Sequence, residues 1–371
     1  MKKRIVLIAN TVWNIVNFRD NLIRSLKDAD YDVLVFAPKD NDLRRLNTEF
    51  FHIPVYAKSM NPLVDILLIV RLVILLHKTT PDVVLNFTIK PVIYGTISAR
   101  ILGIPCVNNI TGLGALFLRG AWSRMLGFML YNIVMRITNI AFFQNPDDFR
   151  LFDRLGLLGR TGVDILPGSG VDLARFTPAK ETLKRNADTV FLFVGRLLLE
   201  KGIEDYIDAA RIVRETWKQV RFQVIGPFDS TGNESALRSK IMLAIKDGAI
   251  LYSEAVEDVR PHLAKADCVV LPSYYREGTP RSLLEAAAME KPIITTDMPG
   301  CREVVEKGKN GYLCRVKDPE DLARKMIQVI GLPTNERFRM GRYGRRKMER
   351  QFDESIVIGK YLSAIKDILG R

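Results

Sequence analysis

The chain has 371 residues, of which 47% are apolar and 26% are charged. This length is sufficient for two domains of about 100–200 residues each, and the composition excludes a disordered or fibrous chain. Charge is the unusual feature, because 55 lysines and arginines stand against 42 aspartates and glutamates, giving a net charge of +13. Nucleic acid, an anionic membrane surface or a phosphorylated substrate would each suit this excess, so charge alone does not choose among them.

The apolar segments are too short or too interrupted to act as membrane anchors. The longest, 63–76 and 125–143, each contain charged side chains, whereas a membrane-spanning helix needs about 20 nearly uninterrupted apolar residues. The basic start, Met1–Arg4, is followed by only five apolar residues, fewer than a signal peptide uses. We therefore expect no transmembrane helix, a buried first strand and a cytoplasmic chain.

The cysteines are spaced as buried thiols. The chain has four cysteines, no C-x-x-C pair and only three histidines. Structural zinc requires clustered ligands, and disulfide frameworks belong mainly to small secreted domains. Each cysteine lies in or beside an apolar run, so we expect reduced, buried thiols at Cys106, Cys268, Cys301 and Cys314.

Short apolar runs alternate with longer helical patterns along the whole chain. In the first half we predict strands over 4–10, 32–37, 82–88, 104–110, 139–144 and 163–166. In the second half we predict strands over 189–195, 221–226, 250–252, 267–272, 292–296 and 311–315. Several of these runs are continuously apolar, as in parallel strands that are buried on both faces and joined by crossover helices. The pattern predicts an α/β chain with two doubly wound parallel sheets.

A segment rich in turn-forming residues, 167–178, separates the two runs. We predict one Rossmann-like domain over 1–170, a second over 171–351 and a C-terminal helix over 352–371 that packs back on the first domain. The carboxyl ends of the strands would border a cleft between the domains, because open α/β sheets bind ligands there.

The predicted strand 189–195 ends at a pair of cations. Gly195 permits a tight turn, and Arg196 and Lys201 precede a predicted helix over 203–217. Two cations beside the N–H groups of a helix start suit a diphosphate. An ordinary strand–helix turn with solvated charges accounts for this segment equally well.

Two glutamates accompany the next candidate helix start. Pro280 suits the first turn of a helix, Glu277 precedes it and we expect Glu285 about two turns inside. The amides of Gly278 and Thr279 would lie at the positive end of that helix. One carboxylate would then meet a ligand beside its phosphates while the other reaches hydroxyls. Spacing alone favours a plainer interpretation, with Glu277 as a partner of the helix dipole and Glu285 solvated.

A third segment, 251–266, reads as a strand, a turn and a short helix. The backbone of such a turn, near Val256, can offer N–H and C=O groups to the edge of a base. An ordinary connection between a strand and a helix would look much the same.

Together these segments resemble the nucleotide-sugar-binding half of retaining GT-B glycosyltransferases of family 4. The resemblance is carried by Arg196 and Lys201, by 256–259, and by Glu277-x7-Glu285 followed by 291–296. In the first half, 86–91 and 108–114 are similar to the bacterial surface-polysaccharide branch of that family. The resemblance covers essentially the whole chain and implies two Rossmann-like domains that face each other across a cleft.

The resemblance implies a reaction and its participants. A sugar, a hexose or N-acetylhexosamine, would move with retention from a UDP-sugar to a polyprenyl-diphosphate-linked glycan, with neither metal nor other cofactor. The first domain would bind this acceptor and the second the donor. The expected setting is the cytoplasmic face of the plasma membrane, with an anionic membrane surface as a partner and no nucleic acid.

The resemblance also implies roles for individual residues. Arg196 and Lys201 would neutralise the leaving diphosphate, and Glu277 would hold the donor sugar, so these three are the expected catalytic residues. Glu285 would accept hydrogen bonds from the ribose. Preorganised cations and N–H groups lower the barrier of such a reaction most, and positioning supplies much of the rest. The remaining donor contacts would come from Gly195, Val256 near the uracil, Gly278, Thr279 and Pro280.

Two departures from the family pattern concern the first domain. Its first loop, 10–19, has no glycine, so we expect Asn14 to contact the donor through its side chain. The histidine that many members carry is absent at its usual place, where Asn108, Asn109 and Thr111 stand as candidate acceptor contacts. We expect the three histidines to be structural: His52 starting a strand, His77 ending an apolar helix, and His262. Transfer would then need no histidine base, because a donor phosphate oxygen can take the acceptor proton.

The acids at positions 28, 30 and 32 imitate a D-x-D metal motif. We expect them to be ordinary turn residues.

Three segments are candidates for membrane contact. The segment 117–126 mixes Trp, Phe, Leu and Arg as interfacial segments do, and we favour it as a membrane-contacting loop. Packing against a sheet accounts equally well for 64–76, and a solvated helix face accounts equally well for the basic cluster over 337–350.

Two other functions are alternatives to a glycosyltransferase. A UDP-sugar epimerase of the same fold would bind a similar donor, although the pairing of two cations with two glutamates argues against it. A basic nucleic-acid-binding protein would explain the charge. However, the sequence has no helix-turn-helix, RNA-recognition or zinc signature.

Overall fold

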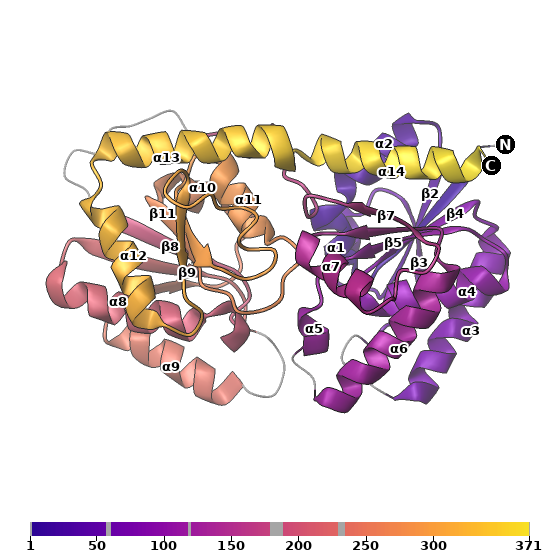
Figure 1. Cartoon of the computed structure of the whole chain (residues 1–371), viewed down its shortest axis with the longest axis horizontal. Helices are drawn as coiled ribbons and strands as arrows, with labels where there is room; N and C mark the ends of the chain where they lie inside the picture. The colour runs from indigo at the N-terminus through magenta and orange to yellow at the C-terminus, as the bar shows by residue number, and fades with distance from the viewer. Residues whose placement is uncertain (1, 57–60, 118–119, 179–187, 229–233, 371) are drawn as a thin grey trace. The chain divides into compact units, whose positions relative to one another are not determined.

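The computed structural model describes residues 2–56, 61–117, 120–178, 188–228 and 234–370. The chain forms two compact units: unit 1 comprises Met1–Ser169 with Ser355–Arg371, and unit 2 comprises Gly170–Glu354. Figure 1 traces them from the indigo N-terminus to the yellow helix α14. Within the described ranges, no helix is long and apolar enough to cross a membrane.

Unit 1 is built on a seven-stranded parallel sheet with the order β3-β2-β1-β4-β5-β6-β7. The strand order reverses between β1 and β4, which is where open α/β sheets bind ligands. The strands are β1 (Arg4–Ile8), β2 (Asp32–Ala37), β3 (Glu49–His52), β4 (Val83–Phe87), β5 (Cys106–Ile110), β6 (Ile140–Phe143) and β7 (Gly162–Ile165).

Both faces of this sheet are covered by helices, because successive side chains of each strand point to opposite faces. Ile5 and Leu7 of β1 pack with α1, α2 and α14, whereas Val6 and Ile8 pack with α3 and α4. On that second face, α6 and α7 cover the neighbouring strands β5 and β6. The helical segments are α1 (Val12–Phe18), α2 (Asp20–Asp28), η1 (Asn41–Arg45), α3 (Pro62–Thr79), η2 (Pro91–Gly95), α4 (Thr96–Ile101), α5 (Gly114–Phe117), α6 (Ala121–Ile137), α7 (Pro146–Arg154) and α14 (Glu354–Leu369).

Unit 2 has a six-stranded parallel sheet with the order β10-β9-β8-β11-β12-β13. One continuous core of aliphatic and aromatic side chains packs this sheet against its helices. The strands are β8 (Thr189–Val194), β9 (Val220–Ile225), β10 (Leu251–Ser253), β11 (Cys268–Leu271), β12 (Ile293–Thr296) and β13 (Gly311–Cys314). The helical segments are η3 (Leu199–Lys201), α8 (Ile203–Thr216), α9 (Glu234–Lys246), α10 (Arg260–Lys265), α11 (Arg281–Ala288), α12 (Pro319–Gly331), α13 (Thr334–Lys347) and η4 (Met348–Phe352).

The twelve predicted strands are confirmed, each to within two residues at either end. The prediction omitted β3, a short edge strand with a half-exposed Glu-Phe-Phe-His sequence that pairs with β2 alone. His52 therefore ends a strand, and the expectation that it starts one was wrong.

The first loop of unit 1 is shorter than expected, because most of 10–19 forms helix α1. The hydroxyl of Thr11 accepts a hydrogen bond from the backbone N–H of Asn14 at 3.0 Å. This N-cap satisfies an amide that would otherwise lack a partner at the helix start. The helix therefore begins immediately after the polar turn that follows β1.

The four cysteines are free and buried, as predicted. Burial raises the pKa of Cys106 to about 11 and that of Cys301 to about 12, so neither thiol ionises at neutral pH. The acids near residue 30 form surface ion pairs, such as that of Asp32 with Arg4 at 2.7 Å. Among the described residues, no group of three or more His, Cys, Asp or Glu side chains is arranged to hold a metal ion.

Candidate functional site

The loops at the carboxyl edge of the unit 2 sheet approach one another closely. Gly202 has φ +75°, and a Cβ there would collide with the carbonyl oxygen of Pro272. Gly300 has φ +84°, and a Cβ there would collide with the carbonyl oxygen of Gly278. Glycine alone adopts this conformation without strain and leaves room for the facing backbone. The loop that follows β11 is thereby packed between the loops that follow β8 and β12.

This packing brings two of the predicted catalytic residues together. The ammonium of Lys201, at the end of η3, forms an ion pair and hydrogen bond with Glu277, in the loop between β11 and α11. Their side chains are only 15% and 12% exposed. The hydroxyl of Ser273 donates a second hydrogen bond to the same Glu277 oxygen, Oε1, at 3.1 Å. Glu277 is thus bound by specific partners, beyond any general attraction to a helix dipole.

Backbone hydrogen bonds fix the same loop. The N–H groups of Tyr274 and Tyr275 both donate to the carbonyl oxygen of Glu200, at 2.9 and 3.0 Å. Glu200 immediately precedes Lys201, so these bonds tie the segment that carries the cation to the segment that carries the carboxylate. Both side chains are positioned by a shared frame, which limits reorganisation when a ligand binds.

Glu285 is also largely buried, and its carboxylate is paired. Its side chain is 15% exposed, and the Arg281 Nε atom donates to its Oε1 atom at 3.0 Å. Burial raises the pKa of Glu285, while the charge of Arg281 and its hydrogen bond oppose that rise. Helix α11 begins at Arg281, so Glu285 lies about one turn inside it and not two as expected. The plainer interpretation of Glu285 as a solvated helix residue was wrong.

The other predicted donor contacts lie on loops of the same sheet edge. Gly195 and the exposed Arg196 follow β8, which is adjacent to β11 in the sheet. Gly278, Thr279 and Pro280 are buried between β11 and α11. Val256 follows β10 and packs partly against the unit 2 core.

Asn14 belongs to unit 1, unlike the other predicted donor contacts. Its side-chain oxygen is buried and accepts no hydrogen bond from the described residues. Thr111 is half-buried and directly follows β5. Both residues lie at the carboxyl edge of the unit 1 sheet.

Asn108 and Asn109 lie deeper in unit 1 than an exposed ligand contact would. Asn108 accepts from Asn86 at 2.9 Å and donates to Thr138 at 2.7 Å. Asn109 donates to the hydroxyl of Tyr361 on α14 at 2.6 Å and accepts from Gln144 at 3.2 Å. Each side chain is at most 1% exposed, so both bind neighbouring elements of unit 1 to the sheet.

The sequence analysis missed two polar residues at this edge. Asn10 Oδ1 and Thr88 Oγ1 are buried, and neither has a hydrogen-bond partner among the described residues. The register pairs Ile8 of β1 with Asn86 of β4, so Asn10 and Thr88, two residues further on, leave adjacent strands at one edge. Thr88 has φ +71°, a strained conformation that often marks a functional site. The two amide oxygens of Asn10 and Asn14 and the hydroxyl oxygen of Thr88 are hereafter together called the amide edge. These oxygens suit ligand hydroxyls.

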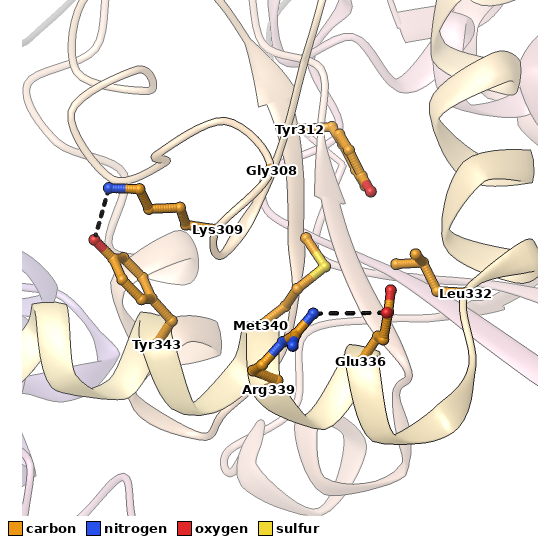
Figure 2. A pocket seen from close by; sticks show the side chains of 8 residues that line it. All are labelled: Gly308, Lys309, Tyr312, Leu332, Glu336, Arg339, Met340 and Tyr343. Carbon is orange, nitrogen blue, oxygen red and sulfur yellow. Dashed lines mark hydrogen bonds and ion pairs between the residues drawn. The ribbon is translucent and has the colours of Figure 1, made fainter.

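A separate cavity of about 240 Å³ lies between α13 and the loop before β13 (Figure 2). Its charged side chains are paired with protein groups: Arg339 with Glu336 at 3.6 Å, and Lys309 with the Tyr343 hydroxyl at 3.4 Å. It contains none of the residues predicted to bind substrate, and we assign it no ligand.

The comparisons with known proteins follow the division into two units. Residues 175–347 match the family described as "Glycosyl transferases group 1", and residues 4–145 match "Glycosyl transferase 4-like". Together the two matches cover most of the chain, which is therefore a glycosyltransferase. Its two parallel sheets with Rossmann-like topology form the GT-B fold that the sequence predicts, and the predicted glycosyltransferase activity is confirmed.

Two curated relatives are similar over most of this glycosyltransferase. A Campylobacter jejuni N,N'-diacetylbacillosaminyl-diphospho-undecaprenol alpha-1,3-N-acetylgalactosaminyltransferase is 25% identical over 97% of each chain. An Escherichia coli UDP-Gal:alpha-D-GlcNAc-diphosphoundecaprenol alpha-1,3-galactosyltransferase is 25% identical over 75% of this chain and 74% of its own. Among solved structures, Anabaena HepE in complex with UDP and glucose has a TM-score of 0.81 at 17% identity, over 98% of this chain and 100% of its own. None of these relatives is named as an epimerase or a nucleic-acid-binding protein.

Proposed function

We propose that this glycosyltransferase moves a hexose or N-acetylhexosamine from a UDP-sugar to a polyprenyl-diphosphate-linked glycan, with retention of configuration and without a metal. Both curated relatives are named for acceptors linked to diphospho-undecaprenol, and one is named for a UDP-sugar donor. HepE, of the same fold, binds UDP. An acceptor with a polyprenyl anchor would place the reaction at the cytoplasmic face of the membrane.

The shielded pair of Lys201 and Glu277 carries the donor half of this proposal. In a nucleotide-sugar the departing group is a diphosphate, whose negative charge grows as the glycosidic bond breaks. A cation fixed in a partly dehydrated site stabilises that charge far more than the same cation in water. We assign this role to Lys201 and, from the neighbouring loop, to Arg196.

The carboxylates would hold the sugars of the donor. We assign Glu277 to the hydroxyls of the transferred sugar and Glu285 to those of the ribose, because ionised carboxylates accept hydrogen bonds strongly. Gly195, Gly278, Thr279 and Pro280 would line the phosphate and sugar pocket, and the backbone near Val256 would contact the uracil.

In the proposed reaction, the bond between the anomeric carbon and the diphosphate oxygen breaks as an acceptor hydroxyl attacks from the same face. The new bond joins that carbon to the acceptor oxygen, and the hydroxyl proton passes to an oxygen of the departing diphosphate. UDP leaves with that proton. Arg196 and Lys201 supply the positive charge in this scheme, and it uses no histidine base.

The acceptor half of the proposal belongs to unit 1. Asn108 and Asn109 already bind protein partners, so we assign them to the frame beneath the acceptor. The amide edge, together with Thr111, offers neutral oxygens that would accept hydrogen bonds from glycan hydroxyls. Asn14 was expected to contact the donor. As part of the amide edge, its side-chain oxygen would also accept a hydrogen bond from the acceptor glycan.

A transfer assay with UDP-sugars and a synthetic polyprenyl-diphosphate glycan tests the proposal. We expect transfer from at least one UDP-sugar in the presence of EDTA, and an NMR spectrum in which the product keeps the donor's anomeric configuration. An inverted product would refute retention, and release of UDP-sugar isomers without an acceptor would establish an epimerase.

A further inference from the structure

The outer face of α3 in unit 1 is apolar, although a surface helix normally presents polar side chains to water. Leu68, Leu72 and Leu76 of α3 are buried against the sheet. The opposite side of the helix carries a second apolar row, and its members are 49–68% exposed: Leu63, Ile66, Leu67, Val70 and Ile74.

Helix α6 repeats this pattern. Tyr131, Val134 and Met135 are buried against the same face of the sheet, while an outer row is 49–81% exposed. This row consists of Trp122, Met125, Leu126, Met129 and Ile133. Both outer rows have the spacing i, i+3, i+4, i+7, i+11, so each forms a continuous stripe along one side of its helix.

The two rows belong to one surface of unit 1. Helix α4 packs against both α3 and α6, and so does η2. In Figure 1 the α3, α4 and α6 ribbons cover the same side of the sheet. We call the ten exposed side chains of the two rows the α3–α6 surface. Each row is a continuous exposed apolar stripe, and exposed apolar surface of this kind marks a binding site.

Charge identifies the class of partner. Helices α3, α4 and α6 contain one acid, Asp65, which accepts from Lys90 and from the Tyr94 hydroxyl, both at 2.6 Å, and is 13% exposed. The same three helices carry five lysines and arginines: Arg71, Lys78, Arg100, Arg124 and Arg136. The helices that carry the α3–α6 surface therefore have an excess of basic side chains, and their single carboxylate is already paired.

We propose that the α3–α6 surface binds the anionic surface of a lipid bilayer. The two apolar rows would enter the boundary between headgroups and acyl chains, with Trp122 as the aromatic anchor. The basic side chains would face anionic headgroups. The inference deepens the proposed function and rests on it for one point, that the acceptor is itself held in the membrane.

This surface unites two segments that the sequence analysis treated separately. The favoured segment, 117–126, is not a loop throughout, because α6 begins at Ala121; Leu118 and Arg119 lie outside the described residues. The segment 64–76 packs against the sheet on one side and contributes to the α3–α6 surface on the other.

The third segment, the basic cluster over 337–350, is partly internal to unit 2. Arg345 Nη1 donates to the carbonyl oxygens of Phe176 and Ala288, at 2.7 and 3.1 Å. Lys347 is 7% exposed and pairs with Glu306 at 3.5 Å. These cations stabilise unit 2 and are not available to a lipid surface.

Sedimentation of the full chain with vesicles tests the proposal. We expect binding to vesicles of phosphatidylcholine with phosphatidylglycerol, and weaker binding to phosphatidylcholine alone. Leu67→Glu and Trp122→Glu should each lower the partition coefficient about tenfold, because each places a charge in the apolar row. Met242→Glu and Leu243→Glu, on α9 of unit 2, are matched controls, because they replace side chains that are 53% and 56% exposed. They should leave the partition coefficient unchanged.

Tryptophan fluorescence supplies a second readout. The chain has three tryptophans, Trp13, Trp122 and Trp217, so a variant with Trp13→Phe and Trp217→Phe reports on Trp122 alone. Its emission should shift to the blue on anionic vesicles and be quenched by brominated acyl chains. Absence of vesicle binding by the wild-type chain, or equal binding by the α3 and α6 variants, would overturn the proposal.

Two further outcomes separate this inference from its alternatives. Concentration-dependent dimerisation that Leu67→Glu abolishes, without vesicle binding, would assign the surface to a second copy of the chain and overturn the proposal. A UDP thermal-shift measurement on the same samples is independent of the surface. UDP binding without vesicle binding refutes the surface alone, and vesicle binding without UDP binding refutes the proposed donor.

Discussion

The carboxyl edges of the two sheets carry opposite kinds of chemistry. In unit 2 the edge is charged and already paired, with Lys201 bound to Glu277 and Arg281 bound to Glu285. In unit 1 the amide edge is uncharged, and its oxygens lack hydrogen-bond partners among the residues described. Under the proposed function, the same topology serves a diphosphate on one sheet and neutral hydroxyls on the other, because the loops and not the strands supply the chemistry.

The largest expected effect comes from breaking the charged edge. Lys201→Gln and Glu277→Gln should each lower kcat/KM for transfer about 10²–10³-fold, or about 2.7–4 kcal/mol, since each removes a preorganised charge or its partner. Steady-state kinetics measure this loss, and circular dichroism checks the fold. Lys309→Gln, which removes a more exposed ion pair in the same unit, should leave transfer intact. Full activity in both site variants would remove the basis for the assigned roles.

Substitutions in the amide edge should change binding of the acceptor and not of the donor. Asn10→Ala removes an oxygen that we assign to a glycan hydroxyl, so the acceptor KM should rise about tenfold, the cost of roughly one hydrogen bond. UDP binding should be unchanged, as a thermal-shift titration would record. A variant that loses UDP binding and keeps its acceptor KM would reverse the assignment of the two edges.

Thr88 allows stability and function to be separated. Thr88→Gly relieves a left-handed conformation at φ +71° and should stabilise unit 1 by about 1 kcal/mol. It should also raise the acceptor KM several-fold, because the hydroxyl is lost. Chemical denaturation and acceptor titrations measure the two effects. Higher stability with an unchanged KM would show that the strain has no role in binding.

Arg281 controls the protonation of Glu285 at the charged edge of unit 2. Burial raises the pKa of Glu285 and Arg281 opposes that rise, so Arg281→Gln should move this pKa further upward. The carboxyl would then take up its proton at a higher pH, and the donor KM should increase several-fold as pH falls from neutral, more steeply than in the wild-type chain. Parallel KM profiles for variant and wild type would refute this. Arg324→Gln, in an exposed i, i+4 pair, is the control.

The smallest effect on activity is expected beneath the amide edge. Tyr361→Phe removes the hydroxyl that accepts from Asn109 at 2.6 Å inside unit 1. The unpaired amide should cost about 1–3 kcal/mol of unfolding free energy, while both KM values stay the same. A changed acceptor KM, with stability intact, would return Asn109 to the group of substrate contacts.

Much of the fold could be predicted because its strands are buried on both faces. Continuous apolar runs such as 191–194 and 268–271 are typical of parallel strands covered by helices on both faces. The edge strand β3 was missed because it pairs on one side only and its Phe50 and Phe51 are flanked by polar residues.

The charged edge of unit 2 was predicted more completely than the amide edge of unit 1. Lys201, Glu277 and Glu285 lie in short motifs whose spacing along the chain already suggests their chemistry. Asn10 and Thr88 are 78 residues apart in sequence, and only the β1–β4 register brings them to one edge. Asn108 and Asn109 resemble ligand contacts in sequence, but the fold buries them between the sheet and its helices.

Binding of UDP to the wild-type chain and to Lys201→Gln, measured by titration calorimetry, tests the central assignment most directly. The assignment predicts that UDP binds the wild-type chain and Lys309→Gln alike, and binds Lys201→Gln at least about tenfold more weakly, because a charge-assisted contact to phosphate is lost. Equal affinity for Lys201→Gln, or no binding of UDP to the wild-type chain, would contradict it.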